Sequence, residues 1–214
     1  MLNNFELPSW FDAPENIKND ILHLWNKSYS ELYDEDFVNN KISVTTGELE
    51  IDIIKLITLY ENESNEDTFK RIMFFNWALC KAVQPNIDAY FASNLAYKSI
   101  LNSLESWSYT SYLSQDFARH DLSADSEYAV TESVAIYQNM IEISKHKNII
   151  NILVDSIDCC IQGNAICHGS QDNRAIFNWL LIDVYPSAYC FKLPEFIYTG
   201  KFDIENWNYS KKIV

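Results

Sequence analysis

Apolar residues recur three or four positions apart along most of the chain, and this spacing predicts amphipathic helices. In the first of these, Asp12 is placed to cap a helix that has Pro14 in its first turn. Its apolar stripe consists of Ile17, Ile21, Leu24 and Trp25. The spacing of the stripe predicts one buried helical face.

Two further helices begin with recognisable signals. Thr45 and Glu48 match a capping box. The apolar positions that follow it are Leu49, Ile53, Leu56 and Tyr60. Asn65 is expected to begin the next helix, whose buried face consists of Phe69, Ile72, Met73, Trp77 and Cys80. Because proline lacks a backbone N–H, Pro85 is expected to end that helix, and a fourth helix is expected over residues 86–104.

Residues 106–128 alternate aromatic and hydroxyl side chains, a pattern open to both a strand and an irregular helix. We interpret this stretch as a short helix and a loop ahead of a long helix over residues 126–146. The buried side of the helix after that consists of Ile149, Ile152, Leu153, Ile157, Cys160 and Ile161. Gly163 is expected to end it as a left-handed cap.

The segment from Gly163 to Pro186 reads GNAICHGSQDNRAIFNWLLIDVYP. Gly169 is expected in a turn, Ser170 at the N-cap of the next helix, and Pro186 at the end of that helix. The inner face of the helix consists of Ile176, Trp179, Leu180 and Val184. The last 28 residues are expected to form an irregular, aromatic-rich tail with one short helix or hairpin.

Glycine and proline are scarce, with four and five residues among 214. Strand-rich chains and doubly wound α/β chains need frequent turn residues, whereas long helices joined by short polar loops do not. The sequence therefore predicts an all-α fold: one domain over residues 1–214, built as a bundle of about seven to nine helices with an irregular C-terminal tail.

The chain has no apolar run of 18 residues and no basic, apolar signal segment at its start, so we expect a cytoplasmic protein without a transmembrane helix. Its five cysteines are odd in number and irregularly spaced, which favours reduced, buried thiols. Cys159, Cys160, Cys167 and His168 lack the second ligand pair of a structural zinc site. We therefore expect no metal and no cofactor.

The formal net charge is −14, from 30 acidic and 16 basic residues. Such a chain repels phosphates and anionic lipids, so we expect neither a nucleic acid nor a membrane as its partner. The same field attracts a basic protein. Acidity that only keeps the chain soluble is the alternative.

One short segment contains residue types that serve in acid–base catalysis. His120 is flanked by Asp116, Arg119 and Asp121. No nucleophile motif and no metalloprotease motif accompanies it, so a solvated loop with salt bridges is the preferred interpretation, and no catalytic residue is assigned. An α-helical enzyme that uses His120 or His168 is one alternative, and a homodimeric scaffold is another.

Arg174 falls in the first turn of its expected helix, where the helix dipole disfavours a cation. We expect its guanidinium to pair with a carboxylate of another helix, either Asp155 or Asp158.

Acidic residues gather in three clusters at predicted helix ends or loops. The first cluster contains Glu31, Asp34, Glu35 and Asp36, the second contains Glu61, Glu63, Glu66 and Asp67, and the third contains Asp116, Asp121, Asp125 and Glu127. Neighbouring loops of a bundle can merge into one electronegative surface, although each cluster alone is typical of a solvated face. The predicted partner-binding residues are Asp34, Glu35, Asp36, Glu61, Glu63, Glu66 and Asp67, with a nearby tyrosine or tryptophan as anchor.

A resemblance to known proteins rests on one stretch of the chain. It consists of Gly163, Ala165, Ile166, Gly169 and Arg174, followed by Phe177-Asn178-Trp179 and Pro186. This stretch resembles bacterial immunity proteins, the cytoplasmic antidotes of polymorphic toxins delivered by contact-dependent or type VI secretion. Small, acidic, glycine-poor helical chains without catalytic motifs are typical of these proteins. The resemblance implies tight, stoichiometric binding to a cognate toxin domain, with a basic nuclease favoured over a membrane toxin.

Overall fold

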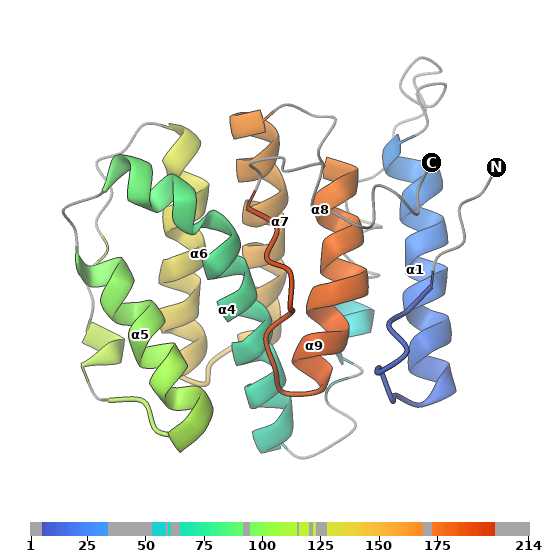
Figure 1. Cartoon of the computed structure of the whole chain (residues 1–214), viewed down its shortest axis with the longest axis horizontal. Coiled ribbons are helices and arrows are strands. Elements are labelled where there is room, and N and C mark those ends of the chain that lie inside the picture. Colours follow the sequence, from blue (N-terminus) through green and yellow to red (C-terminus); the bar gives the residue numbers. More distant parts are fainter. Residues whose placement is uncertain are drawn as a thin grey trace.

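The computed structural model describes residues 6–33, 53–58, 60, 65–91, 95–114, 116–119, 122, 128–168 and 173–199. Every regular element within these ranges is a helix, which confirms the all-α prediction. Most of the long helices run roughly along one direction of the molecule (Figure 1). We call the end where α1 finishes at Tyr33 the upper end, and the end where α4 begins at Asn65 the lower end.

Five long helices form most of the bundle. They are α1 (Glu15–Tyr33), α4 (Asn65–Tyr90), α5 (Leu95–Thr110), α6 (Tyr128–Ser144) and α7 (Ile149–His168). A continuous helical stretch follows, consisting of α8 (Asn173–Trp179), the π-helical turn η4 (Leu180–Val184) and α9 (Tyr185–Tyr189). Shorter helical pieces cover residues 53–58 and the 3₁₀ turn η2 (Phe117–Arg119).

Helix α4 is the central element of the bundle. All residues from Arg71 to Cys80 are buried, so this stretch has no solvent-facing side. A helix that is buried all round must be enclosed by its neighbours, and α4 packs against α5, α6, α7 and α9. The asparagine within this stretch, Asn76, is fully buried and donates its amide to the Ile136 carbonyl of α6 at 3.3 Å.

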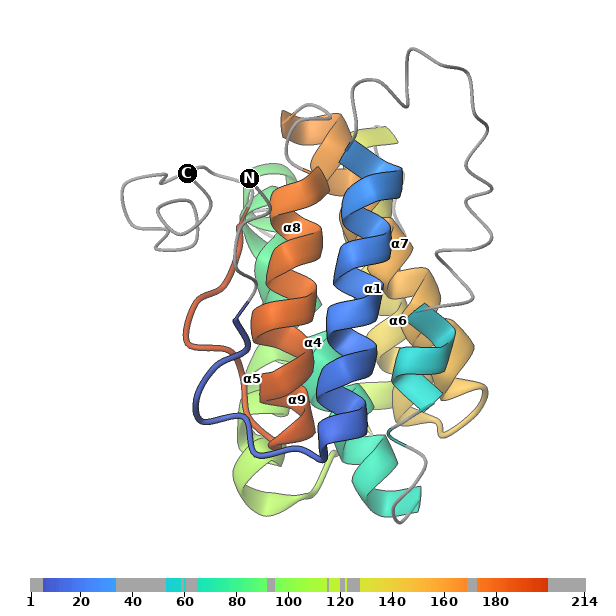
Figure 2. The same cartoon turned by 90° about the vertical axis from the view of Figure 1, so that its right-hand side faces the viewer.

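Helix α1 covers the side of the bundle formed by α8 (Figure 2). Its predicted stripe is buried, which confirms the amphipathic pattern for Ile17, Ile21, Leu24 and Trp25. The indole Nε1 of Trp25 donates a hydrogen bond of 2.8 Å to the Asn178 side chain, 153 positions along the chain. This bond gives α1 a fixed position against α8.

The predicted end of the third helix is wrong. It begins at Asn65 as expected, but α4 continues through Pro85 to Tyr90, and α5 begins only at Leu95. A proline inside a helix costs about 3 kcal/mol because it removes one hydrogen bond and crowds the preceding turn. Packing beyond the proline offsets this cost: Ile87 is buried, and Asn86 donates to Ser133 of α6 at 3.3 Å. The last turns of α4 bend toward α5 (Figure 1).

The expected role of Pro186 as a helix end is also wrong. Pro186 lies in the first turn of α9, directly after the π-helical turn η4. The Tyr185 N–H bonds to the Leu180 carbonyl, five residues back instead of four. The wider turn leaves room for the proline ring, which in an α-helix crowds the carbonyl four residues earlier. The helical stretch therefore continues to Tyr189.

The prediction that Gly163 ends its helix is wrong, because α7 continues to His168. A glycine in a helix interior costs only about 1 kcal/mol, so it does not by itself end a helix. Thr45, Glu48, Gly169 and Ser170 lie outside the described residues.

The predicted inner face around Trp179 is confirmed, since Ile176, Trp179, Leu180 and Val184 are all buried. After α9, residues 190–199 run along the bundle without helix, as expected for the tail, and residues 200–214 lie outside the description. The Trp179 indole donates to the Phe196 carbonyl at 2.9 Å, and its ring contacts Tyr198. Trp179 thus attaches this segment to α8.

None of the helices in the described ranges combines the length and the apolar composition that a membrane crossing requires.

The burial of Trp179 generates a stability prediction. The side chain is 1% exposed, so Trp179→Ala leaves a cavity and an unpaired Phe196 carbonyl. We expect a loss of about 3–5 kcal/mol in the free energy of unfolding, measured by urea denaturation. The control is Tyr109→Ala, at an exposed position, for which we expect a change within about 0.5 kcal/mol. An equal effect of the two substitutions would contradict the packing role of Trp179.

Candidate functional site

Two of the predicted partner-binding residues, Glu66 and Asp67, lie in the first turn of α4. Carboxylates there interact favourably with the positive end of the helix dipole. Glu66 is exposed and pairs with Lys70 at 2.7 Å, and this hydrogen bond raises the pKa of Lys70. The other five, Asp34, Glu35, Asp36, Glu61 and Glu63, lie outside the described residues.

The helix ends beside the first two acidic clusters lie far apart. Tyr33 ends α1 at the upper end, whereas Asn65 begins α4 at the lower end (Figures 1 and 2). The C-terminal end of α5 also lies at the lower end, close in sequence to Asp116 of the third cluster. The described residues therefore place Glu66 and Asp67 at the same end of the bundle as the end of α5.

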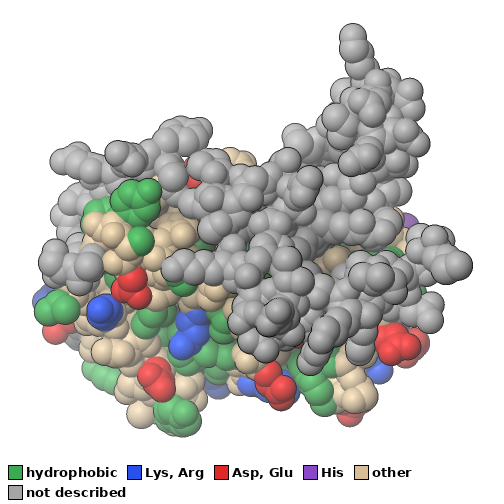
Figure 3. Space-filling model, turned by 45° about the horizontal axis from the view of Figure 1, so that its top comes forward, with side chains coloured by type: hydrophobic (Ala, Val, Ile, Leu, Met, Phe, Trp, Pro, Cys, Tyr) green, Lys and Arg blue, Asp and Glu red, His purple; other side chains and the backbone are tan. Residues whose placement is uncertain are grey.

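On the face of the molecule shown in Figure 3, acidic and basic side chains of the described residues are interspersed among apolar ones. Several exposed carboxylates have a basic neighbour close in sequence: Asp116 pairs with Arg119 at 3.4 Å and Glu142 with Lys145 at 2.5 Å. Exposed pairs of this kind contribute about 0–1 kcal/mol each. They locally offset the acidic excess without stabilising the fold much.

The remaining residues singled out in the sequence fall partly outside the description. His120, Asp121, Asp125 and Glu127 are not described, and neither are the side chains of Cys167, His168 and Arg174. The carboxylates expected to pair with Arg174 are exposed on α7: Asp155 accepts a hydrogen bond from Asn139 at 2.7 Å, and Asp158 accepts one from Gln162. The Arg174 pairing remains a prediction.

Cys80, Cys159 and Cys160 are buried free thiols, which confirms the sequence prediction for these three residues, and Cys190 is half-buried. Burial raises the pKa of Cys160 to about 12, and burial also raises the pKa of Cys80 well above its usual value. The pKa of Cys159 is raised by burial and by a hydrogen bond with Glu132. These thiols stay protonated at neutral pH, so they are poor nucleophiles and poor metal ligands. Within the described residues, no three His, Cys, Asp or Glu side chains are grouped to hold a metal ion.

Arg71 of α4 is 3% exposed, a burial that the sequence patterns did not predict. Its guanidinium carbon lies 4.0 Å from the ring centroid of Tyr189 and 5.1 Å from that of Phe191, and its Nε donates to the Tyr189 carbonyl at 3.1 Å. Aromatic faces attract a cation most strongly where water is excluded. Arg71 therefore binds α4 to the end of α9 and to the segment after it.

Tyrosines complete the surroundings of Arg71. Tyr60 stacks on Tyr185 with 4.8 Å between ring centroids, and its ring centroid lies 5.8 Å from the Arg71 guanidinium carbon. The Tyr60 hydroxyl donates to the Tyr185 carbonyl at 3.2 Å, and the Tyr185 hydroxyl donates to the Leu56 carbonyl at 3.1 Å. Phe11, before α1, packs edge-on against Tyr189. We call Phe11, Tyr60, Arg71, Tyr185, Tyr189 and Phe191 the Arg71 cluster.

The electrostatics of the Arg71 cluster indicate a structural role. Burial raises the pKa of Tyr60 and of Tyr185, and the nearby Arg71 charge only partly opposes these shifts. Both phenols therefore stay protonated at neutral pH and act as hydrogen-bond donors. Phe191 has a left-handed backbone with φ of 55°, a conformation that costs energy outside glycine. Its position over Arg71 and its N–H bond to the Ala188 carbonyl hold it there.

One feature of the sequence indicates that Arg71 is buried. Arg71 follows Thr68 by three residues and precedes Phe75 by four, so it occupies a helical face with two buried neighbours. A cation on such a face indicates either an ion pair or an aromatic environment. The tyrosines could not be assigned to it, because they come from segments more than a hundred residues apart.

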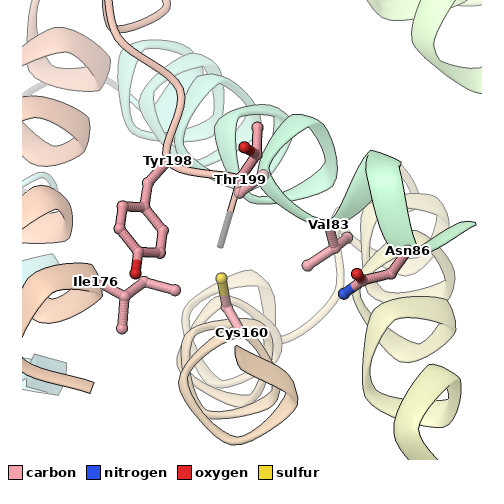
Figure 4. Close-up of a pocket in the computed structure, with 7 residues that line it drawn as sticks. Val83, Asn86, Cys160, Ile176, Tyr198 and Thr199 are labelled. Carbon is pink, nitrogen blue, oxygen red and sulfur yellow. The ribbon is translucent and has the colours of Figure 1, made fainter. Parts of the chain in front are cut away.

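Two cavities between the helices are small. One, of about 10 Å³, is lined by Ala82, Val83, Asn86, Cys160, Ile176, Tyr198 and Thr199. In Figure 4, the Cys160 thiol points into it between Tyr198 and Ile176 on one side and Val83 on the other. The second, of about 20 Å³, is lined by Ile53, Leu56, Ile57, Phe75, Ile157, Phe177, Leu180, Leu181 and Tyr185. Each has room for about one water molecule.

Several large apolar side chains of the described residues face solvent. The two most exposed aromatic ones are Tyr109 at 85% and Tyr112 at 67%.

Comparison of the chain with protein-family models, with curated proteins and with solved structures gives no match.

The Arg71 cluster generates a second stability prediction. Lysine keeps the charge of Arg71 but loses the planar group that stacks on Tyr189 and the Nε–H bond to its carbonyl. We expect Arg71→Lys to lower the free energy of unfolding by about 1–3 kcal/mol in urea denaturation. The matched control is Arg119→Lys at an exposed position, with no measurable change. A fully stable Arg71→Lys variant would show that charge alone suffices at this position.

The buried thiols generate a labelling prediction. With a pKa of about 12, Cys160 is ionised at pH 8 in only about one molecule in ten thousand. We expect Cys80 and Cys160 to resist iodoacetamide in the native protein at pH 8, and to be labelled fully in urea. Peptide mass spectrometry reads each site separately. Rapid native labelling of Cys160 would contradict its burial in the core.

Proposed function

We propose that this chain is an immunity protein, which binds a cognate bacterial toxin domain in the cytoplasm and neutralises it by forming a stoichiometric complex. The observation that carries the proposal is the net charge of −14 on a small helical protein. The resemblance of residues 163–186 to immunity proteins supports the same class.

A nuclease toxin is the favoured partner. Nucleases bind phosphates through basic residues, so their substrate-binding surface is complementary to an acidic protein. Long-range attraction between the two proteins accelerates their encounter, and rapid capture is what an antidote requires. Binding over the basic surface also blocks access of the nucleic acid.

The described fold supports a role in protein binding. Its helices enclose a dense core, and the two cavities described above have room for about one water molecule each. A rigid body of this kind loses little conformational entropy when it binds a partner through its surface. The proposed acidic contacts are Asp34, Glu35, Asp36, Glu61, Glu63, Glu66 and Asp67.

Co-expression tests the proposal. The toxin candidate is the C-terminal domain encoded by the neighbouring upstream gene, which we expect to encode a large secreted protein. Cells that express this domain should survive only when the present chain is also expressed, and the two proteins should co-purify. Association should slow several-fold as salt rises from about 50 to 500 mM, because exposed charges are screened. Equal cell death with and without the chain, and no complex, would refute the proposal.

A further inference from the structure

The C-terminal turn of α5 exposes two tyrosines, whereas most aromatic side chains of the described residues are buried. Tyr109 is 85% exposed and Tyr112 is 67% exposed. Two residues before Tyr109, Trp107 is buried and packs on Phe74 of α4 with 5.3 Å between ring centroids. The same turn therefore fixes one aromatic ring in the core and directs another into solvent.

Local hydrogen bonds hold this turn in one conformation. The Ser111 N–H bonds to the Trp107 carbonyl at 2.7 Å, and the Tyr112 N–H bonds to the Thr110 hydroxyl at 3.2 Å. Ser111 is left-handed, with φ of 54°, although it is not a glycine. These hydrogen bonds define the backbone of the turn, so binding through Tyr109 and Tyr112 orders mainly their side chains.

Acidic residues flank the two tyrosines. Glu105 lies one helical turn before Tyr109, and Asp116 lies four residues after Tyr112; both are exposed. The described charged residues from 105 to 119 are Glu105, Asp116 and Arg119, and the chain as a whole carries a net charge of −14. Exposed tyrosines on an acidic chain are complementary to a basic protein surface: the charges accelerate the encounter, and the rings bury apolar area in the contact.

We propose that Tyr109 and Tyr112 are the anchor residues through which the chain binds the basic surface of its toxin partner. This inference rests on the proposed function and locates the binding energy at the C-terminal turn of α5. The exposed carboxylates Glu105 and Asp116 attract the partner, and the two rings slow its dissociation.

The test is a set of variants measured by biolayer interferometry against the toxin domain of the upstream gene, made catalytically inactive. Tyr109→Ala combined with Tyr112→Ala should weaken affinity by at least about thirtyfold, mainly through faster dissociation. Glu105→Gln combined with Asp116→Asn should slow association several-fold at about 50 mM salt and much less at about 500 mM.

Matched controls separate this surface from general effects of substitution. Tyr90, at the end of α4, is 54% exposed and lies beside the opposite end of α5, so Tyr90→Ala should leave affinity unchanged. Glu195→Gln removes an exposed charge elsewhere and should not alter the association rate. All variants should keep the wild-type melting temperature, because these side chains are exposed or are removed without a cavity.

The outcomes distinguish the two proposals. If the double tyrosine variant binds the toxin domain as tightly as the wild type does, Tyr109 and Tyr112 are not the anchor residues. The proposed immunity function would still stand. Absence of wild-type binding would refute the immunity function and the anchor with it. A wild-type homodimer that the tyrosine variant converts to a monomer would assign the surface to a second copy of this chain and overturn the anchor.

Discussion

The Arg71 guanidinium is the interaction on which the arrangement of the lower end of the bundle depends. A buried cation is costly unless its surroundings replace water, and here the Tyr189 and Phe191 rings and the Tyr189 carbonyl do so. These groups come from α9 and the segment after it, whereas Arg71 belongs to α4. The π-helical turn before α9 and the course of residues 190–199 place Tyr189 and Phe191 against Arg71. Tyr60, which stacks on Tyr185, lies beside the same guanidinium.

The same packing also supports the end of α5. Helix α4 is enclosed by its neighbours, and Phe74, three residues after Arg71, packs on Trp107 of α5. The exposed tyrosines at the end of α5 are therefore attached to the central helix through one buried contact. A surface on such a support keeps its shape in the free protein, which is the condition for fast binding without rearrangement.

The sequence predicted the helices well, but it did not predict where several of them end. Apolar stripes identified the buried faces of α1 and α7, because helical spacing reports burial directly. The stripe residues of α4 from Ile72 to Cys80 are buried too, but so is every other residue from Arg71 to Cys80. Pro85, Gly163 and Pro186 misled the boundary predictions, since each is a local preference of at most a few kcal/mol. Packing around Ile87 and a π-helical turn before Pro186 outweigh these preferences. Neither feature is visible in a local window of sequence.

The candidate site was less predictable than the fold. Acidic clusters can be read from the chain, but their relation in space depends on which helix ends meet, and α1 and α4 reach opposite ends of the bundle. The exposure of Tyr109 follows from the orientation of α5, whose buried residues are Tyr97, Ile100, Leu104 and Trp107. The tyrosines around Arg71 come from distant segments, so no spacing rule brings them together.

The hydrogen bond between Trp25 and Asn178 has a consequence for synthesis of the chain. Helix α1 is made before its partner α8, because Asn178 follows Trp25 by 153 residues. At translation rates of about 5–20 residues per second, α1 waits for about eight to thirty seconds before α8 is made. During that interval the nascent chain exposes Ile17, Ile21 and Leu24 to other apolar surfaces. The order of synthesis therefore leaves the apolar stripe of α1 open to aggregation until α8 has been made.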